Sequence, residues 1–366
     1  MSAPPPSGPP GQYPPPPQYG SQPQYPPPPP EWYAEQQRRK LQAAHPHPEP
    51  RSYPLMLRTW SYAWWKPVVG LLLGLVIFFI VQILLTVFLV IGAAVDGGPG
   101  SLGERVTAAG NLDTVTPWTM LYVNLGLASL TLVTWLVVRV VHGLRPRWLA
   151  SVLPGVRWKF LFACVGLAAV ALGASLVVGA FLPEDPNGTS GTAHAPTGQL
   201  LATAVVILFT TPLQAIGEEY GFRGYLMQAF GSFFRSRVVA LLVTSLLFAL
   251  AHGTQNFPLF FDRFAFGLMA GLVVILVGGL EAGIALHVLN NLLAFGVAIA
   301  YDQLDSTLTV SHASWWQLPV TLVQNGLYLV LVLWVARRMG LRSTTAPPPR
   351  TGGDEQEVQG AVLPAR

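Results

Sequence analysis

Charged residues are scarce in this chain of 366 residues: only 10% are Asp, Glu, Lys or Arg, while 51% are hydrophobic. A soluble domain carries roughly a quarter charged residues, so this chain lacks the polar side chains that would cover a water-facing surface. The shortage excludes an ordinary soluble globular protein. The apolar residues also form continuous runs rather than amphipathic stripes, which indicates a membrane protein.

Cysteine, a signal peptide and barrel-type strands are also missing. The single cysteine, Cys164, lies inside an apolar run. It therefore excludes a disulfide framework and is expected to serve packing. The first 50 residues contain no apolar core, so no cleavable signal peptide is predicted. No strand-like alternation of barrel length occurs. The apolar runs should then be helices, because backbone groups in lipid must be satisfied within the segment.

Apolar runs of membrane-crossing length fill the middle of the chain. Roughly 20 helical residues cross the hydrocarbon core. The fifth run is short, and the fourth is expected to continue helically past its charges toward residue 230. The predicted fold is an all-α polytopic bundle of about eight transmembrane helices. The charge-free runs are at about 67–95, 114–138, 160–182, 195–217, 238–251, 264–280, 282–300 and 315–336.

Both ends of the chain are polar. Residues 1–54 hold 19 of the 34 prolines and are predicted to form a disordered, partly polyproline-II cytosolic tail. This tail is a candidate ligand for proline-recognition domains, and a solubilising or spacer role is the alternative. The predicted organisation continues with N-terminal transmembrane helices at 55–194, a core with buried polar residues at 195–300, a last transmembrane helix within 301–342 and a disordered tail at 343–366.

Basic and acidic residues alternate between successive loops. Lys and Arg collect before the first run and at 139–159, 223–237 and 337–342, whereas the other loops carry Asp and Glu. The positive-inside rule therefore predicts that both termini are cytoplasmic. The same distribution argues against nucleic acid as a partner, because the basic residues act as topology signals. Only two basic residues, Arg105 and Arg263, fall on the acidic side.

Ionisable residues near the apolar runs are the first functional candidates, because a charged side chain at bilayer depth costs roughly 2.5–3.5 kcal/mol. Glu219 and Arg223 stand one helical turn apart and can form an ion pair. Glu218 projects about 100° away from Glu219 on a helix and is free to act as a general base or acid. A cytoplasmic helix end rich in Glu and Arg is the alternative interpretation.

Two histidine motifs follow on later runs. His252 comes four residues after Phe248, and His287 stands one turn before Asn291, on the same helix face. The alternatives are a hydrogen-bonded interior histidine and a polar contact between helices. Counting 1.5 Å per residue from the predicted turns, these side chains can meet Glu218 in the cytoplasmic half of the membrane. The expected result is a chamber that opens toward the cytoplasm.

The ordered set EExxxR, FxxxH and HxxxN resembles the CPBP family, which comprises type II CAAX prenyl endopeptidases and bacteriocin-processing or self-immunity proteins (lysostaphin resistance protein A-like, Abi). The resemblance covers about 195–300 and implies an intramembrane endopeptidase. By this analogy Glu218 and His252 activate a water molecule. His287 and Asn291 hold the tetrahedral oxyanion, directly or beside a metal. The implied supporting residues are Glu219, Arg223 and Phe248.

Metal dependence stays open at this point. Glu218, His252 and His287 are a ligand set that zinc uses in hydrolases, and the resembled family is often labelled metalloprotease. The chain has no HExxH motif, which is the usual zinc-protease spacing. A metal-free glutamate mechanism has also been argued for the family. The GxSxG and Gly-x-Gly-Asp signatures of other proteases are absent as well.

Two other classes of function remain as alternatives. A non-catalytic membrane immunity or scaffold protein would act through the Pro-rich tail, although here the motif set is intact. A secondary transporter would also use buried Glu, His and Asn residues, but the first three runs do not repeat the charge pattern of the later ones. The predicted substrate of the protease is a membrane-tethered peptide or protein, CAAX-type or other. The predicted location is a cell membrane, with a bacterial plasma membrane favoured.

Overall fold

The computed structural model describes residues 30–183 and 198–348. These residues form helices and loops, with no strand and two isolated β-bridges among them. Seven of the described helices are long and apolar enough to cross a membrane, which makes the protein a multi-pass membrane protein. They are α2 (Trp65–Val95), α4 (Pro117–Val141), α5 (Trp158–Ala180), the continuous helix Gly198–Phe234, α9 (Phe257–Val277), α10 (Glu281–Ala300) and α12 (Gln317–Arg338).

The remaining apolar helix, α8 (Arg237–Leu250), has only 14 residues. It corresponds to the run that was already short in the sequence, so the all-α bundle of about eight apolar helices is confirmed. The fourth membrane helix also continues past its charges, as expected. It consists of α6 (Gly198–Glu218), a π-helical segment η3 (Glu219–Leu226) and α7 (Met227–Phe234).

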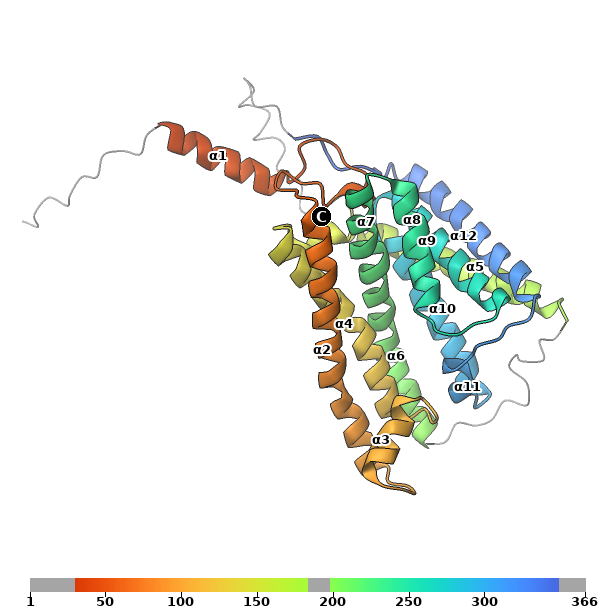
Figure 1. Cartoon of the computed structure of the whole chain (residues 1–366). Helices are drawn as coiled ribbons and strands as arrows, with labels where there is room; N and C mark the ends of the chain where they lie inside the picture. The colour runs from red at the N-terminus through yellow and green to blue at the C-terminus, as the bar shows by residue number, and fades with distance from the viewer. Residues whose placement is uncertain (1–29, 184–197, 349–366) are drawn as a thin grey trace, which may run out of the picture.

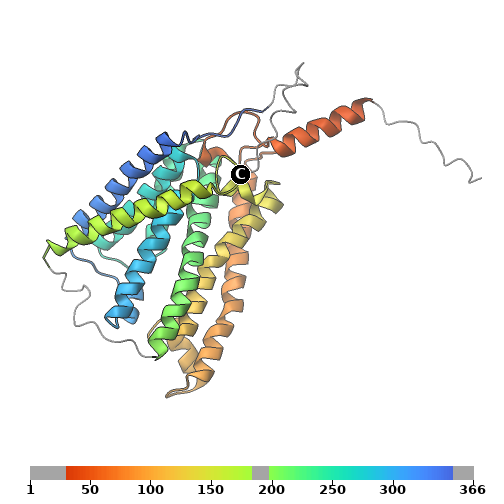
Figure 2. The same cartoon turned by 180° about the vertical axis from the view of Figure 1, so that it is seen from behind.

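The helices form two groups, one on each side of the α6–α10 contact (Figures 1 and 2). On one side α2 packs against α4 and α4 against α6, while on the other α5 and α12 pack together and α12 contacts α9. Helix α10 contacts both α5 and α6 and so joins the two sides. Gly217 permits the backbones of α6 and α4 to pack closely, because a Cβ atom at this position would lie 2.2 Å from the carbonyl oxygen of Leu127 on α4.

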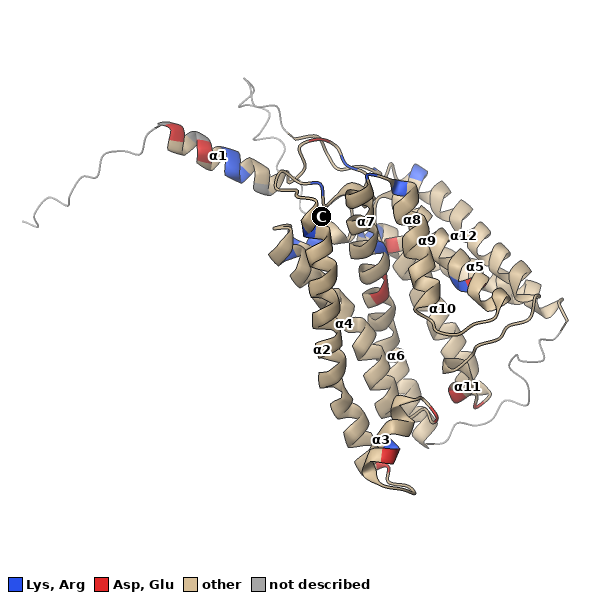
Figure 3. Cartoon of the chain, viewed as in Figure 1, with Lys and Arg blue, Asp and Glu red and all other residues tan. Residues whose placement is uncertain are grey.

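The two ends of the bundle differ in charge (Figure 3). One end carries α1 (Pro30–Ala44), the short helix η2 (Pro146–Leu149) and the α7–α8 turn, and Lys and Arg gather there. The opposite end carries α3 (Leu102–Gly110) and α11 (Leu304–Leu308), where Asp and Glu gather. We call them the basic end and the acidic end. The cytoplasmic location of the basic end remains a prediction of the positive-inside rule.

The N-terminal tail expected at 1–54 differs from the expectation in its last part. Tyr53 and Met56 are fully buried at the basic end. The backbone N–H of Arg51 donates to the hydroxyl of Thr345, and the backbone N–H of Thr345 donates to the carbonyl oxygen of Arg51, both at 2.9 Å. These bonds join the segment to the start of the C-terminal tail. A short apolar cluster at the end of a Pro-rich stretch accounts for the packing. The rest of both expected tails, apart from α1 and a few flanking residues, lies outside the described residues.

Candidate functional site

The first motif lies where the backbone changes from α-helical to π-helical geometry. Pro212 stands inside α6, where it removes a backbone donor and loosens the helix. The π-helical segment η3 then begins at Glu219, and such segments recur at functional sites. Glu218 and Glu219 are 6% and 0% exposed. Their burial excludes the alternative that they belong to a solvated helix end.

Glu219 is held by two cationic or hydrogen-bonding partners. Its Oε1 atom accepts hydrogen bonds from Nη1 of Arg223 and from Nδ1 of His287, both at 2.9 Å. The predicted Glu219–Arg223 ion pair is therefore present, and the guanidinium also lies 4.0 Å from the ring centre of Phe248. Gly283 leaves the space for this carboxylate, since a Cβ atom there would lie 2.5 Å from Oε2 of Glu219.

The contact with Glu219 fixes the orientation and tautomer of His287. Because a carboxylate only accepts, Nδ1 of His287 carries the hydrogen. The other ring nitrogen, Nε2, then lies 3.3 Å from Oε2 of Glu218. That oxygen is buried and makes no hydrogen bond within the described part of the chain. Glu218 therefore presents one acceptor oxygen that is unsatisfied.

Gln214 is a site residue that the sequence analysis missed. It stands one helical turn before Glu218, and its Nε2 atom donates to Oε1 of that carboxylate at 2.7 Å. Its Oε1 atom accepts from Nδ2 of Asn291 at 3.1 Å. Gln214 thus connects the first and third motifs. Its polar side chain within an apolar run, four residues from Glu218, was a signal that could have revealed it.

A cavity of about 350 Å³ brings the predicted catalytic side chains together: Glu218, His252, His287 and Asn291 all line it. Nδ1 of His252 lies 2.8 Å from the carbonyl oxygen of Phe248 and donates to it, which leaves Nε2 free. We call this cavity the chamber. The wall facing these residues is polar and comes from α9, α12 and the loop before α12, with Asp262, Arg263, His312, Gln317, Gln324 and Asn325.

The lining of the chamber includes part of a loop that the sequence analysis did not connect with the site. Val310, His312 and Ala313 come from the loop between α11 and α12, and the side chain of His312 is exposed. The predicted opening toward the cytoplasm stays a prediction. Glu218 stands sixteen residues before Phe234, at most about 24 Å along the helix axis. The turn expected near residue 230 comes later, and this shifts the site away from the basic end.

The donors as placed do not form the three-ligand set of a zinc hydrolase. Among the residues that the structure describes, no three His, Cys, Asp or Glu side chains are grouped to hold a metal ion. Glu218 and His287 are close to each other, whereas His252 does not complete a cluster with them. The metal role expected for these three residues is thus not supported by their placement.

The apolar helices and the grouped Glu, His and Asn side chains define the class of this protein: a multi-pass membrane protein with a polar chamber between its helices. Residues 200–293 match the model of a family described as type II CAAX prenyl endopeptidase Rce1-like. This segment contains all three motifs, so the resemblance expected from them is confirmed. The match supports a CAAX-type intramembrane protease.

A relative among curated proteins is also similar to this chain. The uncharacterized protein YyaK of Bacillus subtilis (strain 168) is 25% identical over 150 residues, which cover 38% of this chain and 49% of that protein. The aligned part thus spans about half of the relative. No solved structure matches the chain.

Proposed function

We propose that this protein is an intramembrane endopeptidase that hydrolyses a peptide bond with a water molecule activated by Glu218. The observation that carries the proposal is the unsatisfied Oε2 atom of Glu218, which lies beside His287 in a chamber shared with His252 and Asn291. The family match over residues 200–293 supports the same reaction class.

In the proposed reaction Glu218 acts first as the general base. Its Oε2 atom takes a proton from water while the water oxygen bonds to the scissile carbonyl carbon and the carbonyl π electrons move to oxygen. The protonated Glu218 then gives that proton to the departing amine nitrogen as the C–N bond breaks. A carboxylate in hydrogen-bond reach of the water suits both steps. Gln214 holds the other carboxylate oxygen and so fixes which oxygen faces the water.

Stabilisation of the oxyanion falls to the carboxamide of Asn291. Asn291 has a second amide hydrogen beyond the one that it donates to Gln214. His252, which also lines the chamber, accepts a hydrogen bond from the attacking water instead, because its Nε2 atom carries no hydrogen when Nδ1 donates to Phe248. Such preorganised groups contribute most where water is excluded. The Glu219–Arg223 pair acts indirectly, because it sets the ring orientation of His287.

The substrate in this proposal is a membrane-tethered peptide or protein, of CAAX type or another type. A chamber bounded by membrane helices favours a substrate that reaches it with part of its chain in the bilayer. The proposed location is the plasma membrane of a bacterium. The Pro-rich N-terminal tail remains a candidate for binding proline-recognition domains, outside the reaction itself.

Glu218→Gln tests the proposal, because it keeps the size and the hydrogen-bonding ability of the side chain and removes the base. Loss of a general base costs roughly 10²–10⁴-fold in rate, so we expect kcat for a lipid-anchored quenched peptide in nanodiscs to fall by about that factor. The melting temperature should stay near that of the wild type. The matched control is Glu104→Gln, at an exposed carboxylate on α3. Unchanged cleavage by Glu218→Gln would refute the mechanism.

A further inference from the structure

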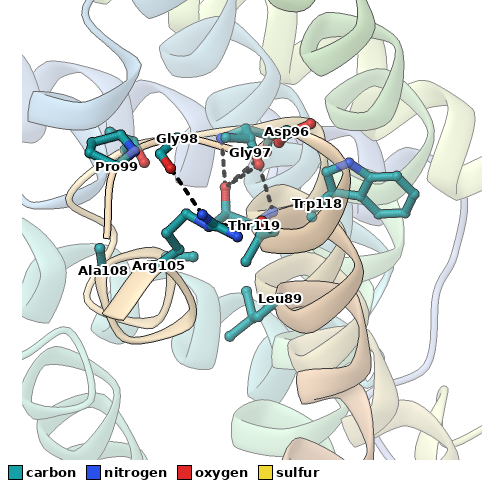
Figure 4. Close-up of a pocket in the computed structure, with 14 residues that line it drawn as sticks. Leu89, Asp96, Gly97, Gly98, Pro99, Arg105, Ala108, Trp118 and Thr119 are labelled. Atoms are coloured by element: carbon teal, nitrogen blue, oxygen red, sulfur yellow. Dashed lines mark hydrogen bonds between the residues drawn. The ribbon is translucent and has the colours of Figure 1, made fainter. Parts of the chain in front are cut away.

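Two basic residues break the charge pattern of the acidic end, and the structure explains only one of them. Arg105 caps backbone carbonyls beside a cavity of about 320 Å³ between α2, α3 and α4 (Figure 4). Its guanidinium donates to the carbonyl oxygens of Ala93 at 3.0 Å, Gly98 at 2.9 Å and Gly100 at 3.1 Å. Arg105 is therefore occupied by its own chain. Arg263 has no such explanation.

Arg263 lies on the second turn of α9 and lines the chamber. Its Nε atom is buried without a hydrogen-bond partner, and no carboxylate of the described chain forms an ion pair with it. It lines the same cavity as His252 and Glu218. Arg263 is half-buried, and a guanidinium that is partly withdrawn from water is stabilised by an anion, which the described part of the chain does not pair with it.

The neighbouring carboxylate, Asp262, forms no ion pair with Arg263 and is directed toward another helix. Oδ1 of Asp262 accepts hydrogen bonds from the hydroxyl of Thr321 and, at 3.3 Å, from Nε2 of Gln317, both on α12. The start of α9 is also fixed, since the Asn256 side chain bonds to both backbone groups of Ala313. The wall that presents Arg263 is thus braced by contacts to α12 and the loop before it.

We propose that Arg263 binds a carboxylate of the substrate, within a few residues of the bond that is cut. The proposal rests on the proposed protease function. A planar guanidinium with free N–H groups matches the two oxygens of a carboxylate. The chamber, at about 350 Å³, lies at the small end of ligand sites and suits a short peptide segment. The carboxylate is the C-terminus of the substrate or an Asp or Glu side chain.

The position of Arg263 also implies how the peptide lies. Glu218 repels a second carboxylate, so the anion of the substrate binds on the α9 side and the scissile carbonyl lies on the α6 side. His252 lines the same chamber as Arg263 and Glu218. A substrate anchored in this way presents a defined bond to Glu218, and Arg263 selects where the chain is cut.

A lipid-anchored peptide of neutral residues tests the proposal in three forms: the free C-terminal acid, the C-terminal amide, and the amide with one internal Asp. Cleavage and binding are measured with the full-length protein in nanodiscs. A charged hydrogen-bonded contact corresponds to about 10- to 100-fold. We expect KM and Kd of the wild type to be lower by that factor for at least one acidic form. Arg263→Gln should remove this preference and leave the kcat and KM of the neutral amide unchanged.

Two further variants make the outcomes decisive. Arg263→Lys keeps the positive charge but loses the paired N–H donors of the guanidinium. It should therefore show an intermediate preference for acidic peptides, and it provides the test if Arg263→Gln does not fold. Arg139→Gln, at an exposed arginine on α4, is the matched control and should keep the preference. The proposed subsite is refuted if Arg263→Gln weakens cleavage and binding of all three peptides equally. It is also refuted if the wild type does not prefer the acidic peptides.

The two proposals can fail separately in this design. Cleavage by the wild type without any preference for acids leaves the protease standing and overturns the subsite. Binding that depends on Arg263 and favours acids, without cleavage of any peptide, supports the subsite and counts against the protease. A preference for the C-terminal acid or for the internal Asp identifies the source of the carboxylate.

Discussion

At the scale of single residues, the two adjacent glutamates have different environments although they share a sequence motif. Glu219 is fully buried, is not among the residues that line the chamber, and its Oε1 atom accepts hydrogen bonds from both Arg223 and His287. Glu218 keeps one oxygen free in the chamber. Their sequence spacing already predicted separate roles, because adjacent helical residues point in different directions. The partner that holds Glu218, however, was Gln214 rather than a charged residue.

Gln214→Leu should therefore impair catalysis without weakening substrate binding. The substitution removes the donor to Glu218 and the acceptor for Asn291, so the carboxylate no longer has one fixed orientation. A misoriented catalytic group costs of order 10²-fold when displaced by about 1 Å. We expect kcat for the lipid-anchored peptide to fall about 10- to 100-fold, with KM within about twofold of the wild type.

Gln199→Leu is the control, because Gln199 is an exposed glutamine at the start of the same helix. The parallel rise of KM and fall of kcat in Gln214→Leu would indicate general disruption of the chamber. Wild-type kinetics in Gln214→Leu would show that Glu218 needs no such positioning.

At the scale of helices, the bundle depends on a buried ion pair that the sequence analysis interpreted only as a topology signal. Arg157, just before α5, donates to both carboxylate oxygens of Glu281 at 2.8 and 2.6 Å, and its Nη1 donates to the carbonyl oxygen of Val277 at 2.8 Å. The pair therefore ties the start of α5 to the turn between α9 and α10. That turn sets the position of His287, two helical turns further along α10.

Glu281→Ala should destabilise the protein strongly. Removing one partner of a buried ion pair costs about 3–5 kcal/mol, because Arg157 is left without its carboxylate while only 11% exposed. Thermal unfolding in detergent should show a drop of many degrees in the melting temperature. Glu49→Ala is the control, since its pair with Arg51 leaves the glutamate 62% exposed and such pairs contribute about 0–1 kcal/mol. Equal effects of the two substitutions would contradict the structural role of Glu281.

The helical elements themselves were largely predictable from the sequence. Each apolar run became a helix, because a hydrophobic stretch of sufficient length in a membrane has few alternatives. The π-helical segment η3 at Glu219 was not predictable, since it depends on how α6 packs against α4 and α10. The packing of Tyr53 at the basic end was missed for a related reason: a five-residue apolar cluster has no periodicity that marks it.

At the scale of the whole molecule, the sequence predicted that four motif side chains lie together but not which residues complete the chamber. Glu218, His252, His287 and Asn291 all line it, and the order and spacing of their motifs were sufficient to predict this. The rest of the lining comes from α9, α12 and the loop before α12, which carry no motif. The far wall with Arg263 was missed for the same reason.

The rim of the chamber leads to a prediction about access that concerns the whole fold. His312 is exposed at the rim, on the loop that follows the acidic end, whereas Arg147 is exposed at the basic end. If the basic end is cytoplasmic, a membrane-impermeant maleimide should label His312→Cys in intact cells and Arg147→Cys only in inside-out vesicles. The background is Cys164→Ser, which removes the one native thiol.

Labelling of both cysteines from the same side of the membrane would contradict this arrangement. A substrate peptide should, by the same argument, protect His312→Cys from the reagent and leave Arg147→Cys unaffected, because only the former lines the chamber. Protection that also requires Arg263 would link the route of entry to the proposed carboxylate contact. The chamber would then receive its substrate from the acidic end of the bundle, opposite to the side on which the basic loops anchor the protein.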